Sequence, residues 1–164
     1  MSELKNKKET IIQVQAKTKP KIEEIIPEYL EGGAKQSLYE LLEFCRTNLV
    51  KYPWSATNIW KLQLKGKTIG MIYIGKFPCQ KADITKKIWY IHIPMFEEII
   101  IKEHLTEVIH RNVLPCVHGQ KSCGPGKTTT ILGKEFNGVH GVLFKNPDTE
   151  TLDCIKKMIK FQLK

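Results

Sequence analysis

The change of hydrophobic period along this chain constrains its fold most. Between residues 58 and 75 apolar side chains recur at every second position, so that Trp60, Leu62 and Leu64 alternate with polar residues. The segments on either side have the spacing of an amphipathic helix instead. A period of two predicts strands with one buried face, whereas a period of 3.6 predicts helices that cover them. The chain is therefore expected to fold as an α+β protein.

Several strands are expected from this pattern. Lys65-Gly66-Lys67 is a tight-turn candidate between two strands, and KIWYIHIP reads as a third strand after a loop that holds Pro78 and Cys79. Two short β-like runs, TTTIL and GVLF, follow later. An antiparallel sheet of four to six strands would accommodate them.

Three helices are expected at about 37–50, 95–113 and 147–162, after a short amphipathic stretch, KIEEIIPEYL. Ser37 and Glu40 form a capping box at the start of the first helix. Asn146 is the expected N-cap of the last helix, with Pro147 as its first residue.

A chain of 164 residues is long enough for one domain with a core. We expect residues 1–19 to form a basic flexible tail and residues 20–164 a single α+β domain. The three helices would cover one face of the sheet, and a Cys/His turn would be an insertion. The expected core is Trp60, Leu62, Leu64, Trp89, Ile91, Ile101, Leu105, Ile155 and Ile159.

The cysteine count and the polar start of the chain favour the cytoplasm. The five cysteines are an odd number, the N-terminal MSELKNKKET lacks the apolar centre of a secretory signal, and no run of about 20 apolar residues occurs. A disulfide framework and a membrane partner are therefore not expected.

The stretch KSCGPGKTTT, residues 121–130, is similar to a phosphate-binding loop but fails its pattern. The loop needs a glycine five residues before Gly126, and Lys121 stands there. The residues from Thr128 onward are β-branched and predict a strand, whereas a phosphate-binding loop opens a helix. The chain is therefore not expected to be a nucleotide hydrolase of this class, and no catalytic residue is assigned to it.

The same region predicts a metal site. Cys116, His118, Cys123 and His140 follow the pattern C-x-H-x4-C-x16-H, and two thiolates with two imidazoles suit tetrahedral zinc. Cys79 and His110 are reserve ligands. Four protein ligands would make the zinc structural, and the favoured function is a non-enzymatic intracellular binding domain for an unknown macromolecule.

A nucleic-acid-binding function is the first alternative. The formal net charge is +9, which attracts polyanions, although a basic surface also serves solubility. Lysines near Trp54, Tyr73 and Tyr90 combine charge with stacking residues, as single-strand binding requires. These lysines are Lys61, Lys65, Lys67, Lys76, Lys81, Lys86 and Lys87.

A thiol- or metal-dependent enzyme is the second alternative. Lys121 and Lys127 could lower the pKa of the Cys116 or Cys123 thiol and so activate it. Cys45 and Cys154 lie on or beside the apolar stripes of expected helices and are expected to pack in the core.

The order of these elements resembles a known family. KLQLKGKTIGMIYIGK, KIWYIHIP and GVLFKNPDTETLDCIKKMIKF together resemble the YdhG-like small α+β domains, over residues 37 to 162. The resemblance implies an intracellular domain with a strand-rich middle and a closing helix, and some members are linked to iron delivery. The ending GKEFNGVHGVLFKNPDTETLDCIKKMI also looks like a set of bacterial proteins that have cysteines at the turn and in place of His140. Thiolate ligands favour zinc over labile iron.

Overall fold

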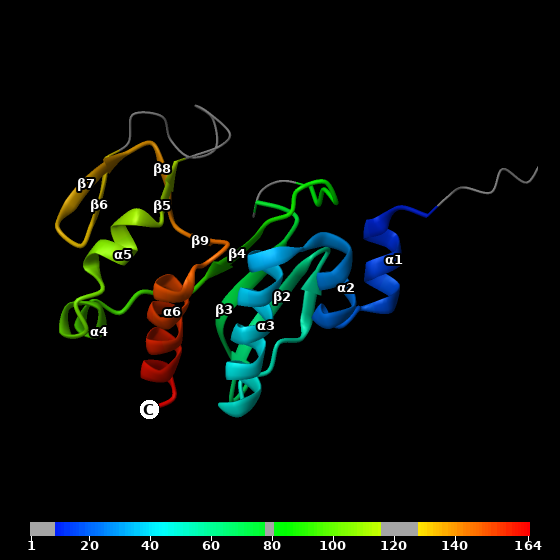
Figure 1. The fold of residues 1–164 in the computed structure, drawn as a ribbon, viewed down its shortest axis with the longest axis horizontal. Helices are drawn as coiled ribbons and strands as arrows, with labels where there is room; N and C mark the ends of the chain where they lie inside the picture. Colours follow the sequence, from blue (N-terminus) through cyan, green and yellow to red (C-terminus); the bar gives the residue numbers. More distant parts are fainter. Residues whose placement is uncertain (1–8, 78–80, 116–127) are drawn as a thin grey trace, which may run out of the picture.

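The structure, a computed structural model, describes residues 9–77, 81–115 and 128–164, apart from the side chain of His140. It confirms the α+β fold, with an antiparallel five-stranded sheet in the order β1-β2-β3-β4-β9 (Figure 1). In this order β1 and β9 are the two edges. The strands are β1 (Trp54–Ala56), β2 (Ile59–Leu64), β3 (Lys67–Ile74), β4 (Trp89–His92) and β9 (Phe144–Lys145).

The period-two pattern sets the register of this sheet. Trp60 lies opposite Ile72, which lies opposite Ile91, and all three side chains are buried. The predicted turn between β2 and β3 is confirmed, because Lys65 and Gly66 have φ angles of 48° and 80° there. Two successive positive φ angles match the twist of a tight hairpin, and glycine adopts the second without strain.

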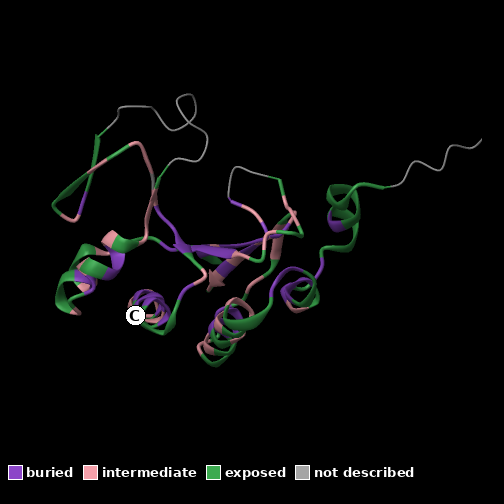
Figure 2. Ribbon diagram, turned by 45° about the horizontal axis from the view of Figure 1, so that its top comes forward, coloured by how far each residue is buried: buried purple, intermediate pink, exposed green. Residues whose placement is uncertain are grey.

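Helices pack on one face of the sheet, where Figure 2 shows α2, α3 and α6 together. Buried residues of these three helices and of the sheet form one continuous cluster around Trp60 and Trp89. Burying such large apolar side chains is the main stabilising contribution to a fold of this size. The helices are α1 (Ile11–Thr18), α2 (Ile22–Tyr29), α3 (Gly32–Thr47), α4 (Glu97–Lys102), α5 (Thr106–Arg111) and α6 (Thr149–Gln162).

The expected core is confirmed with two exceptions. Leu64 is only partly buried, at the end of β2, and the prediction for Ile101 was wrong because 64% of it is exposed. The residues confirmed as buried are Trp60, Leu62, Trp89, Ile91, Leu105, Ile155 and Ile159.

The exposure of Ile101 follows from a break in the helix predicted at 95–113. His104 has a φ of 56°, and the N–H of Leu105 donates to the carbonyl of Ile100 at 2.8 Å. A left-handed residue with this bond closes a helix, so the predicted helix becomes α4 and α5. In α4 the buried residue is Ile100, and Ile101 lies on the exposed side.

Two predicted helix starts were also wrong. Helix α3 begins five residues before Ser37, whose hydroxyl instead accepts from the Trp89 indole at 3.3 Å. Asp148 caps α6, accepting from the Thr151 N–H at 2.8 Å. Asn146 prolongs the sheet: its N–H donates to Trp89 and its side chain accepts from Trp89. The side chains of Ser37 and Asn146, which the local pattern predicted as helix caps, both bond to Trp89 instead.

Part of the predicted tail is helical. Thr10 and Gln13 form a capping box at the start of α1, and Gln15 in this helix is 3% exposed. The amide of Gln15 donates to the Asn58 side chain at 2.6 Å and accepts from the Asn58 N–H at 2.9 Å. These two bonds attach α1 to the turn between β1 and β2. Residues 1–8 lie outside the described residues.

Two small two-stranded sheets lie beside α5 (Figure 1). Strand β5 (Val113–Pro115) pairs with β8 (Val139–Val142), and β6 (Thr128–Ile131) pairs with β7 (Lys134–Asn137). The run TTTIL is therefore a strand, as predicted, and not the start of the helix that a phosphate-binding loop requires.

Candidate functional site

The predicted zinc ligands fall mostly where the structure gives no placement. Cys116, His118, Cys123 and the reserve ligand Cys79 lie outside the described residues, and His140 is described only as a backbone position in β8. Within the described residues no group of three or more His, Cys, Asp or Glu side chains could hold a metal ion. The zinc site therefore stays a prediction.

The strands beside this segment are nevertheless informative. Pro115, just before residue 116, pairs with Val139, and Thr128, just after residue 127, pairs with Asn137. The two flanking residues are thus joined to positions only two apart in the chain, and His140 follows directly. His110 is engaged elsewhere, because its Nε2 lies 2.9 Å from the carbonyl oxygen of Ile131.

Most of the predicted nucleic-acid-binding lysines are divided between the two ends of β3. Lys65 and Lys67 flank the turn at one end of β3, whereas Lys76 follows the other end, about 23 Å away for a strand of this length. Lys61 lies within β2, and Lys81, Lys86 and Lys87 lie with Lys76 in the connection to β4.

The aromatic residues expected beside these lysines are mostly buried. Tyr73 and Tyr90 form a second apolar cluster with Phe77 and Leu143, on the face of the sheet away from α3. Phe77 meets Tyr90 edge-on at 5.4 Å between ring centroids. This face is therefore not the open stacking surface that the sequence suggested.

The two described thiols are unsuited to nucleophilic chemistry. Cys45 in α3 and Cys154 in α6 have no exposed surface, and burial raises the pKa of the Cys45 thiol to about 12 and that of Cys154 to about 11. Because the thiolate is the nucleophile, both groups are inert near neutral pH. Their predicted place in the core is confirmed.

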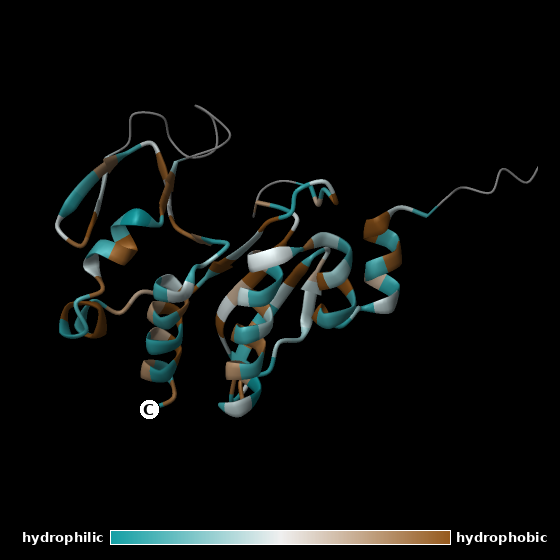
Figure 3. Ribbon diagram, viewed as in Figure 1, coloured by the Kyte–Doolittle hydropathy of each residue, from teal (hydrophilic) through white to brown (hydrophobic). Residues whose placement is uncertain are grey.

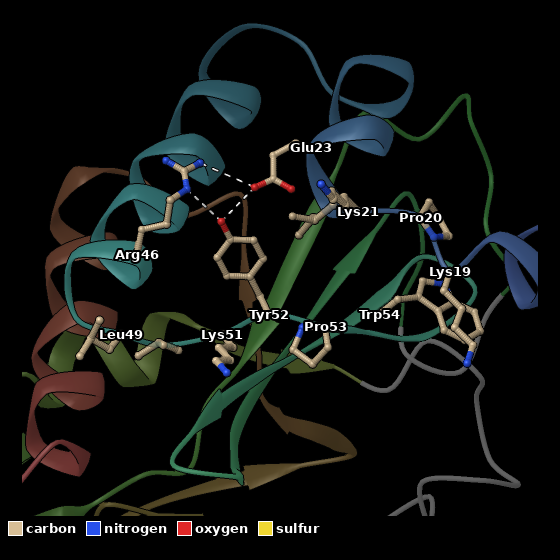
Figure 4. Close-up of a pocket in the computed structure, with 12 residues that line it drawn as sticks. Lys19, Pro20, Lys21, Glu23, Arg46, Leu49, Lys51, Tyr52, Pro53 and Trp54 are labelled. Carbon is tan, nitrogen blue, oxygen red and sulfur yellow. Dashed lines mark hydrogen bonds and ion pairs between the residues drawn. The ribbon is translucent and has the colours of Figure 1, made fainter.

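A groove that the sequence did not reveal lies at the free edge of the sheet. It runs between β1, the start of α2 and the end of α3, and encloses about 740 Å³ (Figure 4). We call it the edge groove. Its apolar lining is Pro20, Ile22, Leu49, Val50, Pro53 and Trp54.

Local hydrogen bonds build the two sides of this groove. The carbonyl of Pro20 accepts from the buried indole of Trp60 at 3.1 Å, which fixes the segment before α2 on the core. At the end of α3 the N–H of Val50 donates to the carbonyl of Cys45 at 2.9 Å. This bond closes the helix around Leu49, which takes a left-handed conformation with a φ of 59°.

Leu49 is unusual in two respects. Glycine is the preferred residue at such a helix end, because a Cβ strains the left-handed backbone by about 1 kcal/mol. Leu49 is also 82% exposed, the highest exposure among the large hydrophobic side chains of the described residues. Neither the backbone nor the core therefore explains a leucine here.

Positive charge surrounds the groove. Lys19, Lys21 and Lys51 line it, and none of their ammonium groups has an ion pair within the described part of the chain. Their charges are therefore available to a ligand. Glu23 is the one carboxylate among the lining residues.

The charge of Glu23 is already engaged. The Tyr52 hydroxyl donates to Glu23 at 2.9 Å and accepts from Arg46 Nε at 3.0 Å, while Arg46 also pairs with Glu23 at 3.7 Å (Figure 4). Burial is the main cause that raises the pKa of the Tyr52 hydroxyl, so it keeps the proton that it donates. The groove therefore presents a net positive rim.

The backbone along the groove has an open edge. The N–H and C=O of Lys51 both bond to Gln63, at 2.9 and 2.7 Å, and the C=O of Pro53 accepts from Lys61 at 3.0 Å. Between them Tyr52 makes no backbone hydrogen bond to any described residue. Because alternate residues of a strand point their peptide groups to opposite sides, Tyr52 directs its N–H and C=O away from β2.

Helix α1 adjoins one end of the groove. The Trp54 indole donates to the Gln15 side chain at 3.4 Å, a weak bond that links β1 to α1. Figure 3 shows hydrophobic residues at the N-terminal end of α1, where Ile11 and Ile12 are 44% and 56% exposed.

Comparisons with known proteins add no assignment. No family model, no curated protein and no solved structure matches this chain. The resemblance to the YdhG-like domains therefore stays a prediction. No helix in the described ranges is both long and apolar enough to cross a membrane.

Proposed function

We propose that this chain is a non-catalytic cytoplasmic binding domain that receives its partner in the edge groove. The observation that carries the proposal is Leu49, an apolar side chain that is 82% exposed on a left-handed backbone. Glycine or asparagine is the preferred residue at such a helix end. Strain that persists without a packing gain is typical of residues that contact a ligand. The two buried free thiols, Cys45 and Cys154, are compatible with a reducing compartment.

An apolar anion tests this proposal without knowledge of the partner. Anilinonaphthalene sulfonate should bind the folded chain with one saturable site, because the groove combines apolar walls with lysines. Leu49→Asp should weaken this binding about tenfold or more, a loss of about 1.4 kcal/mol. Ile101→Asp is the matched control, since it changes another exposed apolar residue, on α4, and should stay within about twofold. If Leu49→Asp and Ile101→Asp bound the dye equally well, the groove would not be the binding surface.

We further propose that a zinc ion held by Cys116, His118, Cys123 and His140 stabilises this domain. The pairing of Pro115 with Val139 and of Thr128 with Asn137 supports it. This pairing places Pro115 opposite Val139 of β8, next to His140, and Thr128 opposite Asn137 of β7, three residues before His140. Zinc sites of this kind contribute directly to folding stability, because the unfolded chain does not hold the ion.

Metal analysis of the untagged protein tests the zinc proposal. We expect about one zinc per chain, and a chelator should lower the melting temperature by several degrees. Cys123→Ser should lose both the metal and the chelator effect, whereas Cys154→Ser should keep both. Protein that carries no metal and melts identically with chelator would rule the site out.

A further inference from the structure

We infer that the occupant of the edge groove is an extended, acidic peptide segment of a partner protein, which pairs with residues 52–54 as an additional strand of the sheet. This inference rests on the proposed function and specifies its ligand. It follows from the open backbone of Tyr52, just before β1, from the charge of the rim and from the residues that line the groove.

The backbone provides the first argument. Tyr52 has an N–H and a C=O that face away from β2 and that no described backbone group satisfies. A peptide strand about 4.8 Å away could bond to both of these groups. Pro53 does not obstruct this, because its carbonyl bonds to Lys61 and its missing N–H therefore belongs to the side that faces β2.

Charge provides the second argument and disfavours two other occupants. Lys19, Lys21 and Lys51 attract an acidic segment, whereas the one lining carboxylate, Glu23, is held by Tyr52 and Arg46. The N-terminal residues of this chain carry Lys5, Lys7 and Lys8 and would be repelled. A second copy paired edge to edge would bring two lysine rims together, which is also unfavourable.

The lining favours a peptide over a single-stranded nucleic acid. Nucleic acid needs successive flat aromatic faces on which bases stack. The groove offers Trp54, but most of its other apolar lining is aliphatic or proline, and the Tyr52 hydroxyl is held by Arg46 and Glu23. A mainly aliphatic groove beside an open backbone edge suits the apolar side chains of an extended peptide.

A random dodecapeptide library displayed on phage tests the inference on the immobilised full chain. We expect enrichment of segments in which Asp or Glu alternates with Val, Ile or Leu. Leu49→Asp and the double variant Lys21→Glu/Lys51→Glu should lose this enrichment. The double variant Lys65→Glu/Lys67→Glu is the matched control, because it changes the net charge equally at the β2–β3 turn, and it should keep the enrichment.

A synthetic peptide from the enriched set then tests the mode of binding. N-methylation of the residue whose N–H meets Tyr52 should weaken binding about tenfold, and methylation of the next residue should have little effect. Changes in the amide resonances of Tyr52 and Trp54 should accompany binding. Equal effects of the two methylations would overturn strand addition.

The possible outcomes distinguish a failure of the peptide inference from a failure of the proposed function. Enrichment of basic peptides, or identical selection by the native chain and Leu49→Asp, overturns the inference. If oligo(dT) binds and Lys21→Glu/Lys51→Glu abolishes its binding while no acidic peptide is enriched, the occupant is a nucleic acid instead. In each case the proposed function still stands if Leu49→Asp weakens the binding of anilinonaphthalene sulfonate, because the groove is then still the binding surface.

Discussion

Single residues in left-handed conformations determine where several helices of this protein end. Lys19, Leu49 and His104 have φ angles of 46°, 59° and 56° and stand at the ends of α1, α3 and α4. None is a glycine, so each position retains some backbone strain. At His104 this strain turns the chain between α4 and α5, whereas at Leu49 it also presents an apolar side chain to the edge groove.

Replacing Leu49 with glycine should therefore stabilise the protein while impairing the groove. We expect Leu49→Gly to raise the free energy of unfolding by about 0.5–1 kcal/mol, because the strain is relieved and little buried surface is lost. Urea unfolding measures this change. Leu49→Ala retains the Cβ and should leave stability nearly unchanged. An equal gain from alanine would show that backbone strain is not the cause.

At the scale of elements, sequence patterns predicted the strands better than the helix limits. Alternation in residues 58–75 identified β2, β3 and their turn, since one buried face requires a fixed register. The starts of α3 and α6 were missed because Ser37 and Asn146 bond to Trp89, more than 50 residues away in the chain. A local sequence pattern does not contain a partner so far away in the chain, so it cannot predict these hydrogen bonds.

The edge groove was missed for a similar reason. The outward-facing backbone of Tyr52 depends on the pairing of its neighbours with β2, and the local sequence does not show which strand lies next to it. The left-handed conformation of Leu49 likewise depends on the closing bond between Val50 and Cys45. The sequence-based predictions concerned lysines and cysteines instead, because the chemistry of these residues can be recognised from residue type alone.

The attachment of α1 provides a prediction at this scale. Gln15→Ala should lower the free energy of unfolding by about 1–3 kcal/mol, because the buried N–H and side chain of Asn58 lose their partner. Hydrogen exchange of the α1 amides should also become faster. Gln36→Ala makes the same chemical change on the exposed side of α3 and should have little effect. Unchanged protection of α1 in Gln15→Ala would show that this contact does not hold the helix.

Across the whole molecule, α3 and α6 pack beside each other over one sheet, and each contributes a cysteine to the shared core. Cys45 and Cys154 are both fully buried there, so the pKa values of their thiols differ between the folded and the unfolded chain. Their pKa values rise from an ordinary 9.0 to about 12 and about 11, with desolvation as the largest cause. This core therefore makes stability depend on pH.

The free energy of unfolding should fall as the pH rises above about 9. In the unfolded chain both thiols lose protons from that pH, whereas in the folded chain they keep them until about pH 11 to 12. The folded state then binds more protons, and each thiol lowers stability by up to about 1.4 kcal/mol per pH unit. Urea unfolding at pH 8, 9 and 10 in the presence of a reductant measures this slope.

Cys154→Ala should reduce the slope of the unfolding free energy against pH, and adding Cys45→Ala should reduce it further. This expectation does not depend on the stability of each variant at pH 8. An identical slope in the native chain and both variants would assign the pH dependence to other groups, such as the buried Tyr73 and Tyr90, whose pKa values burial also raises.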